Sequence, residues 1–266
     1  METGSEEKKM PLTDHLEELR KRLIRILMVI GLGFGVCYAF KDTLFAVLTK
    51  PVADVLPKGS FMIYTNMTEA FFIYMEIAFF ASLILTAPFT LYQIWKFVSP
   101  GLYPRERRYV LPFMITSTVL FSGGVLFGYF VVLPPAFSFF VTFTSDFLKP
   151  MLSLKEYLSL SLKFLLAFGL SFELPVFIFF LTKIGLVNAA MLSRQRRYAI
   201  LVIFIAAAVL TPSPDALSQI LMAIPLMILY ELSIYVAKFA QKKRPVASDG
   251  LGMEDSNHEH TQRPRP

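Results

Sequence analysis

The sequence predicts an all-α membrane protein with six transmembrane helices, and three observations support this fold class. Hydrophobic residues make up 55% of the 266-residue chain and charged residues only 17%, and the mean hydropathy is +0.56. Soluble domains are usually about 45–50% apolar and about 25% charged. The apolar excess is gathered into long runs, and Lys and Arg are concentrated between particular runs. We therefore expect a polytopic bundle with both termini in the cytoplasm.

The apolar runs that could span a membrane cover residues 24–40, 71–98, 110–133, 158–181, 198–210 and 217–236. Only helices and closed barrels satisfy the backbone in lipid, and continuous rather than alternating runs favour helices. Residues 1–23 are then a cytoplasmic amphipathic segment, 24–236 the transmembrane domain, and 237–266 a polar tail expected to be disordered. The first run follows a polar stretch and lacks a small-residue cleavage site, so we expect a span rather than a cleaved signal.

The basic residues set the orientation of the bundle. Most of the 26 Lys and Arg residues lie in 1–25, 96–108, 183–197 and after 236, which are the segments on one side of the predicted spans. Cytoplasmic loops carry such an excess. The rule also explains the net charge of +6, which therefore does not call for a nucleic-acid partner.

The remaining segments predict details of the bundle. The outer loops at 41–70 and 134–157 carry turn residues and apolar residues, so we expect them to pack as caps. The run 198–210 would reach only about 20 Å as a helix, against a hydrocarbon core of about 30 Å. The last two spans therefore either thin the bilayer or are extended by flanking residues. Bends are expected where prolines interrupt the spans, at Pro88, Pro112, Pro175 and Pro225.

Before the first span, leucines recur at helical spacing at residues 12, 16, 19 and 23. Asp14 and Glu17 stand at the spacing of a capping box, which favours a helix start near Asp14. This helix would lie along the cytoplasmic interface and hold Glu17 and Glu18 among positive charges. The alternative is a solvated charged helix that only sets the orientation.

Glu173 is an ionisable residue inside the run 158–181. A charge at membrane depth costs several kcal/mol or more unless it faces protein, water or a partner, which makes Glu173 a functional-site candidate. It could carry a proton or receive a polar group from a partner. Pro175 frees the Ser171 carbonyl nearby, which adds polarity. The alternative is a purely structural bond to a neighbouring helix.

The segment 99–108 places Glu106 among arginines, beside the apolar residues Phe97, Leu102 and Tyr103. A local salt bridge is the ordinary interpretation. A carboxylate beside an apolar surface also suits a cationic, partly hydrophobic ligand, because guanidinium pairs bidentately with carboxylate.

Other function classes fit less well. The single cysteine, Cys37, excludes an internal disulfide framework, and three histidines offer little for a metal site or a catalytic set, so no cofactor is expected. A proton-coupled solute transporter would show more polar residues in several spans, or internal repeats.

Four stretches, in order along the chain, carry a resemblance to the TatC family, the signal-peptide receptors of the twin-arginine protein translocase. They are Pro11-Leu-x-x-His-Leu-x-Glu-Leu-Arg20, Ser99-Pro-Gly-Leu-Tyr-x-x-Glu-Arg-Arg108, Phe168-Gly-Leu-Ser-Phe-Glu-Leu-Pro-Val176 and Leu210-Thr-Pro-Ser-Pro-Asp-Ala-Leu-Ser-Gln219. The resemblance implies a non-enzymatic receptor in the bacterial inner membrane, with a concave helix bundle. It also implies binding of twin-arginine signal peptides of folded cargo, TatA- and TatB-like single-span partners, self-association, and use of the proton-motive force.

The resemblance also assigns roles to residues. Glu18 and Glu106 match the carboxylates that read the arginine pair, with Leu19, Arg20 and Tyr103 in the same signal-peptide site. Within the membrane it implies a polar or partner-docking role for Glu173 and Gln219. It marks Pro51 and Asp215 as further functional positions, in the first and last outer loops.

Overall fold

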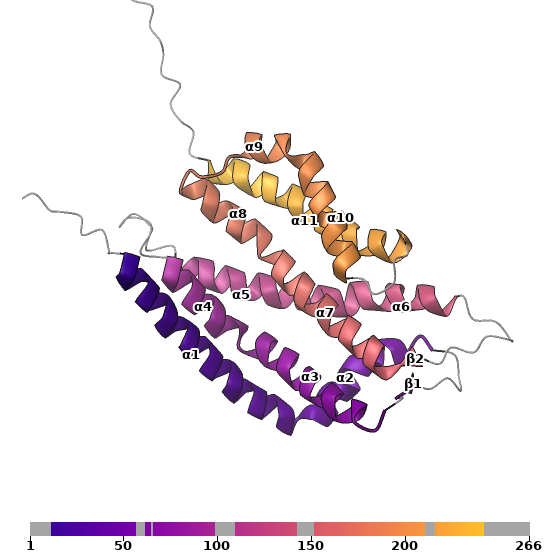
Figure 1. Cartoon of the computed structure of the whole chain (residues 1–266). Coiled ribbons are helices and arrows are strands. Elements are labelled where there is room, and N and C mark those ends of the chain that lie inside the picture. The colour runs from indigo at the N-terminus through magenta and orange to yellow at the C-terminus, as the bar shows by residue number, and fades with distance from the viewer. Residues whose placement is uncertain are drawn as a thin grey trace, which may run out of the picture.

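The computed structural model describes residues 12–56, 62–64, 66–98, 110–142, 152–210 and 216–241, and nearly all of them are helical (Figure 1). Glu106, Tyr103 and Asp215 lie outside these ranges. In chain order, the elements are α1 (Leu12–Ala39), α2 (Lys41–Ala53), β1 (Met62–Ile63), α3 (Glu69–Leu85), α4 (Ala87–Val98), α5 (Val110–Phe127), the π-helix η3 (Gly128–Val132), α6 (Leu133–Val141), β2 (Leu152–Ser153), α7 (Leu154–Phe172), α8 (Leu174–Lys183), α9 (Ala189–Arg194), α10 (Arg196–Leu210) and α11 (Ala216–Ala240).

Four helical stretches among the described residues are long and apolar enough to cross a membrane. They are Thr13–Ala39, Leu111–Phe139, Leu154–Lys183 and Gln219–Ala240, and the bent pair α3 and α4 would make a fifth. Helix α10 has 15 residues and reaches about 22 Å, which is shorter than the hydrocarbon core. The predicted helical, multi-pass class is confirmed.

Proline positions explain where the long helices are interrupted. The axes of α3 and α4 differ by 53° at a break beside Pro88, as predicted. The chain passes from α7 to α8 at Glu173, with Pro175 in the first turn of α8. Pro112 lies in the first turn of α5, where its missing N–H costs no helical hydrogen bond. Helix α11 continues through Pro225 without a break.

Helix α1 joins the predicted amphipathic segment and the first span into one element of 28 residues. The residues around Leu23 and Ile24 include no glycine or proline, so the sequence has no signal that would end the helix there. The charged first turns of α1 are therefore continuous with its apolar turns.

Glycines bring the central helices α5 and α7 unusually close. A Cβ at Gly124 of α5 would lie 2.6 Å from the carbonyl oxygen of Phe168, and one at Gly169 of α7 would lie 2.9 Å from Phe121. Small residues allow such backbone approach between membrane helices. Gly33 serves α1 and α3 similarly, since a Cβ there would lie 2.9 Å from Thr86.

The segment around Pro51 packs against η3, α6 and the start of α7. Pro51 is buried inside α2, and its missing N–H leaves the Val47 carbonyl without its helical donor. The Tyr129 hydroxyl donates to that carbonyl at 2.7 Å, and the Tyr157 hydroxyl donates to the Leu48 carbonyl at 2.6 Å. Strands β1 and β2 add a short parallel pair at this end.

Figure 1 shows that the first residues of α1 and α5 lie at one end of the bundle. The last residues of α4, α8 and α11 lie at the same end. Helix α2 and the strands lie at the opposite end. The first end holds most of the described basic residues, among them Arg20, Arg25, Lys96, Lys183, Arg197 and Lys238. The charge asymmetry along the sequence is therefore an asymmetry between the two ends.

Candidate functional site

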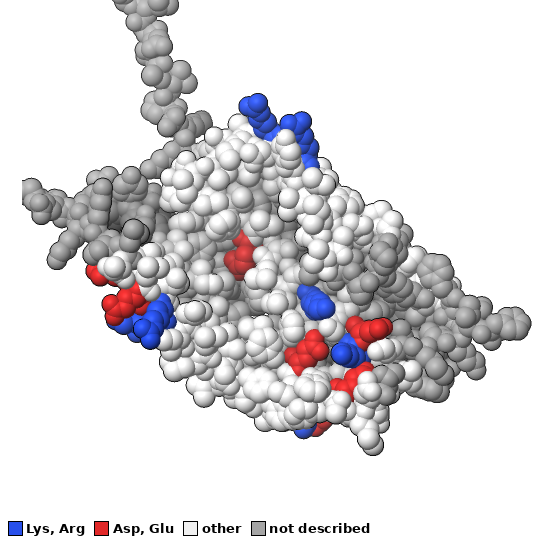
Figure 2. All heavy atoms as spheres, viewed as in Figure 1, with Lys and Arg blue, Asp and Glu red and all other residues white. Residues whose placement is uncertain are grey.

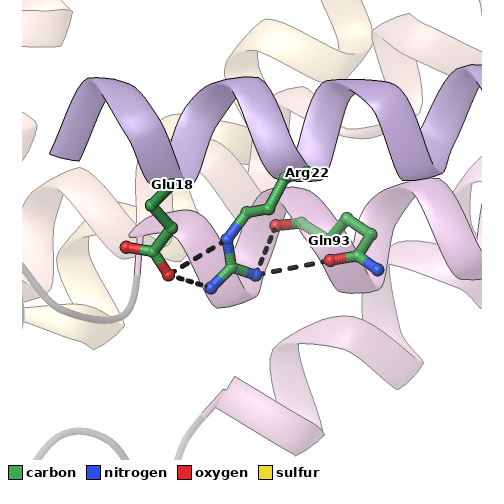
Figure 3. Close-up of polar contacts among 3 residues, drawn as sticks. All are labelled: Glu18, Arg22 and Gln93. Carbon is green, nitrogen blue, oxygen red and sulfur yellow. Dashed lines mark hydrogen bonds and ion pairs between the residues drawn. The ribbon is translucent and has the colours of Figure 1, made fainter. Parts of the chain in front are cut away.

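At the basic end, Glu18 of α1 is held by Arg22, one helical turn later (Figure 3). The Glu18 side chain is 28% exposed and that of Arg22 only 8%. Arg22 Nε donates to Glu18 Oε1 at 3.2 Å, and Nη2 donates to the same oxygen. The other carboxylate oxygen, Oε2, receives no hydrogen bond from the described residues. Glu18 is thus a half-buried, oriented carboxylate with one oxygen available to a ligand.

Helix α4 packs against the buried side of the Glu18–Arg22 pair. Arg22 Nη1 donates to the backbone oxygen of Gln93 at 3.5 Å and to its side-chain Oε1 at 3.4 Å. Nearer the end of the bundle, the His15 ring stacks on Phe97 with centroids 4.3 Å apart. Leu19 and Arg20 are exposed beside Glu18. These contacts fix the register of α1 on α4.

A second polar position lies deeper, at the junction of α7 and α8. Glu173 Oε1 is shielded from solvent and has no hydrogen-bond partner among the described residues. The Ser117 side chain of α5 interacts with the Glu173 carboxyl group. The Ser117 hydroxyl also accepts a hydrogen bond from Trp95 Nε1 at 2.9 Å, and Trp95 stacks on Phe113 with centroids 5.1 Å apart. A carboxyl group in this apolar setting can receive a hydrogen-bond donor from another helix.

The surface beside Glu173 is apolar. A hollow of about 340 Å³ lies between α5 and α8 and reaches α11, with almost no polar lining. The residues that line it are Pro112, Phe113, Thr116, Leu120, Pro175, Val176, Phe179 and Val236. Figure 2 shows a broad, mostly uncharged face with one isolated acidic group near its centre, while the other charged side chains lie toward the two ends of the molecule. Such a surface suits an apolar helix with few polar groups.

The other predicted positions are spread over the molecule. Gln219 Nε2 donates to the Phe204 carbonyl at 2.9 Å and so connects α11 to α10. Pro51 lies in the packed α2 segment at the end opposite Glu18. Because Glu106 and Tyr103 fall outside the described residues, the structure does not place them beside Glu18.

Arg22, Gln93, Ser117 and Trp95 were not predicted as members of a site. The Glu18–Arg22 pair has the i, i+4 spacing of a helical ion pair, so the sequence carried a signal for it. Gln93 and Ser117 contact partners on other helices, so no local sequence pattern could predict these contacts.

Comparisons with known proteins give a single family. Residues 14–225 match the family model described as Sec-independent protein translocase protein (TatC). The chain belongs to the TatC family. A TatC protein of Desulforapulum autotrophicum is 48% identical over 239 residues, covering 90% of this chain and 88% of the relative. That of Aquifex aeolicus is 39% identical over 237 residues, covering 88% and 98%.

A solved structure shares the fold. The crystal structure of a twin-arginine translocase receptor, TatC, aligns with a TM-score of 0.79 at 38% identity, covering 85% of this chain and 99% of that one. TatC proteins are components of a protein translocase and are not enzymes. They are multi-pass inner-membrane proteins. The apolar helices of this TatC-family chain agree with that location.

Proposed function

We propose that this chain is the signal-peptide receptor subunit of a twin-arginine translocase, and that Glu18 contacts one arginine of the signal. The observation that carries the proposal is the half-buried Glu18 carboxylate with Oε2 available at the basic end of the bundle. A charge-assisted pair with a guanidinium contributes about 1.5–3 kcal/mol. Glu106 supplies the second carboxylate, with Leu19, Arg20 and Tyr103 around the pair.

The proposal places the basic end in the cytoplasm and gives the chain six membrane crossings. Helix α10, although short, is then the fifth crossing, and residues 1–23 and 237–266 are cytoplasmic. The common position of the start of α1 and the end of α11 supports this topology (Figure 1), as does the excess of Lys and Arg there.

Within the membrane, Glu173 receives a polar group from a single-span TatA- or TatB-like partner. Its unpartnered Oε1 and the apolar hollow beside it support this role. Gln219, Pro51 and Asp215 act in the same assembly, which moves folded cargo with the proton-motive force. The chain also self-associates in this assembly.

The deciding experiment is binding of a fluorescent twin-arginine peptide and its twin-lysine version to the purified chain in nanodiscs. Glu18→Gln and Glu106→Gln should each weaken twin-arginine binding by about 10- to 100-fold. Glu17→Gln is the matched control, because Glu17 is exposed and paired with Lys21 at 2.7 Å. Equal binding of both peptides to the unmodified chain, or unchanged affinity in both variants, would contradict the proposal.

A further inference from the structure

Arg22 differs from the other basic residues of α1 in its burial. It is 6% exposed, whereas the side chain of its neighbour Lys21 is 62% exposed and pairs with Glu17 across one turn. A buried cation is costly unless it is paired and hydrogen-bonded. Arg22 therefore does more than add a charge that orients the first span.

The guanidinium of Arg22 divides its donors between two helices (Figure 3). Nε and Nη2 point to Glu18, while Nη1 points to Gln93 of α4. Gln93 is itself 4% exposed, so this side of the guanidinium is enclosed by protein. The planar fork of arginine presents its donors to both partners in a fixed geometry, whereas the ammonium of lysine is a compact point charge whose three donors rotate freely.

Both contacts from Arg22 to Glu18 end on Oε1. The arrangement fixes the carboxylate plane and leaves Oε2 as the open oxygen. We propose that Arg22 is a positioning residue of the signal-peptide site, which anchors Glu18 to α4 and sets the direction from which Oε2 meets an incoming guanidinium. This inference rests on the proposed function and names the element that gives the site its selectivity for arginine.

Loss of the anchor should lower the selectivity of the site for arginine over lysine. A Glu18 freed from Arg22 is a mobile, unpaired anion, which attracts ammonium and guanidinium groups alike. Arginine then loses the preset geometry that favours it. The ratio of twin-lysine to twin-arginine dissociation constants should therefore fall.

The test measures that ratio for the full chain in nanodiscs, with the same two peptides. Arg22→Lys keeps a cation in the buried position and should lower the ratio by about fivefold or more. Arg22→Gln should lower it at least as far. Gln93→Ala, which removes only the side-chain contact to Nη1, should lower it by about twofold. Lys21→Gln is the control, with the unmodified ratio expected.

The outcomes separate the two proposals. If the unmodified chain does not prefer the twin-arginine peptide, the proposed function fails. If it does, but Arg22→Lys and Gln93→Ala both keep the unmodified ratio, the receptor function stands and the positioning role of Arg22 is overturned. A uniform loss of affinity for both peptides at a constant ratio would also overturn it, because that is the result of general damage to the fold.

Discussion

At the scale of single residues, Glu173 is defined by what it does not contact. Its Oε1 is enclosed but receives no hydrogen bond from the described residues, and the helix is interrupted at this residue. The polar side chain that interacts with this carboxyl group is Ser117 of α5, which leaves Oε1 without a donor from the described residues. The geometry therefore favours a role in which Glu173 Oε1 accepts a hydrogen bond from a donor on another protein.

Glu173→Ala should reduce crosslinking of the chain to a TatA-like single-span helix while leaving twin-arginine peptide affinity within about twofold. Its thermal midpoint in detergent should change little, because the loss of the Ser117 contact is offset by the removal of a buried ionisable group whose Oε1 has no hydrogen-bond partner among the described residues. Glu173→Gln keeps hydrogen-bonding capacity and is the control for crosslinking. A lower midpoint with normal crosslinking would identify Glu173 as a structural residue.

Tyr129 and Pro51 form a second residue-scale unit. Because Pro51 removes the helical donor for the Val47 carbonyl, Tyr129→Phe should remove the hydrogen bond that replaces it and lower the free energy of unfolding by about 0.5–1.5 kcal/mol. In a Pro51→Ala background the restored N–H can serve Val47, so the same substitution should cost less. A double-mutant cycle measured by denaturant unfolding in detergent checks this coupling. Additive effects would show that Tyr129 does not compensate for Pro51.

At the scale of elements, the sequence predicted those features that follow from the requirements of a membrane-spanning helix. The apolar runs, the bend beside Pro88 and the interruption near Pro175 all follow from local composition. The continuity of α1 past Leu23 was harder to predict, because the composition changes there from charged to apolar residues although the helix continues. The Arg22–Gln93 contact joins residues 71 positions apart, so only the packing of α1 on α4 reveals it.

The close approach of α5 and α7 gives a test of packing at the same scale. Gly124→Ala would place a Cβ 2.6 Å from the backbone oxygen of Phe168, so one helix must shift. We expect a loss of about 1–3 kcal/mol in unfolding free energy. Gly123→Ala is the matched control, because a Cβ there has nothing within 4 Å, and alanine has the higher helix propensity. Equal effects of the two substitutions would show that α5 and α7 do not pack this tightly.

At the scale of the whole molecule, the position of each site depends on which end faces the cytoplasm. The Glu18–Arg22 pair lies at the basic end, and the Pro51 segment lies at the other (Figure 1). A cytoplasmic ligand reaches Glu18 only if the basic end is inside. Glu173, at the α7–α8 junction, would then meet a partner within the bilayer rather than the arginine pair.

Single-cysteine labelling can determine this orientation, because Cys37 is the only cysteine and is buried. In a Cys37→Ala background, Met67→Cys places a thiol at a position that is 95% exposed, between β1 and α3. Ala190→Cys places one at an exposed position of α9, at the opposite end. A membrane-impermeant maleimide added to intact cells should label the first and not the second, and permeabilising the inner membrane should expose the second. The reverse pattern would put Glu18 on the outer face and remove it from the reach of a cytoplasmic signal peptide.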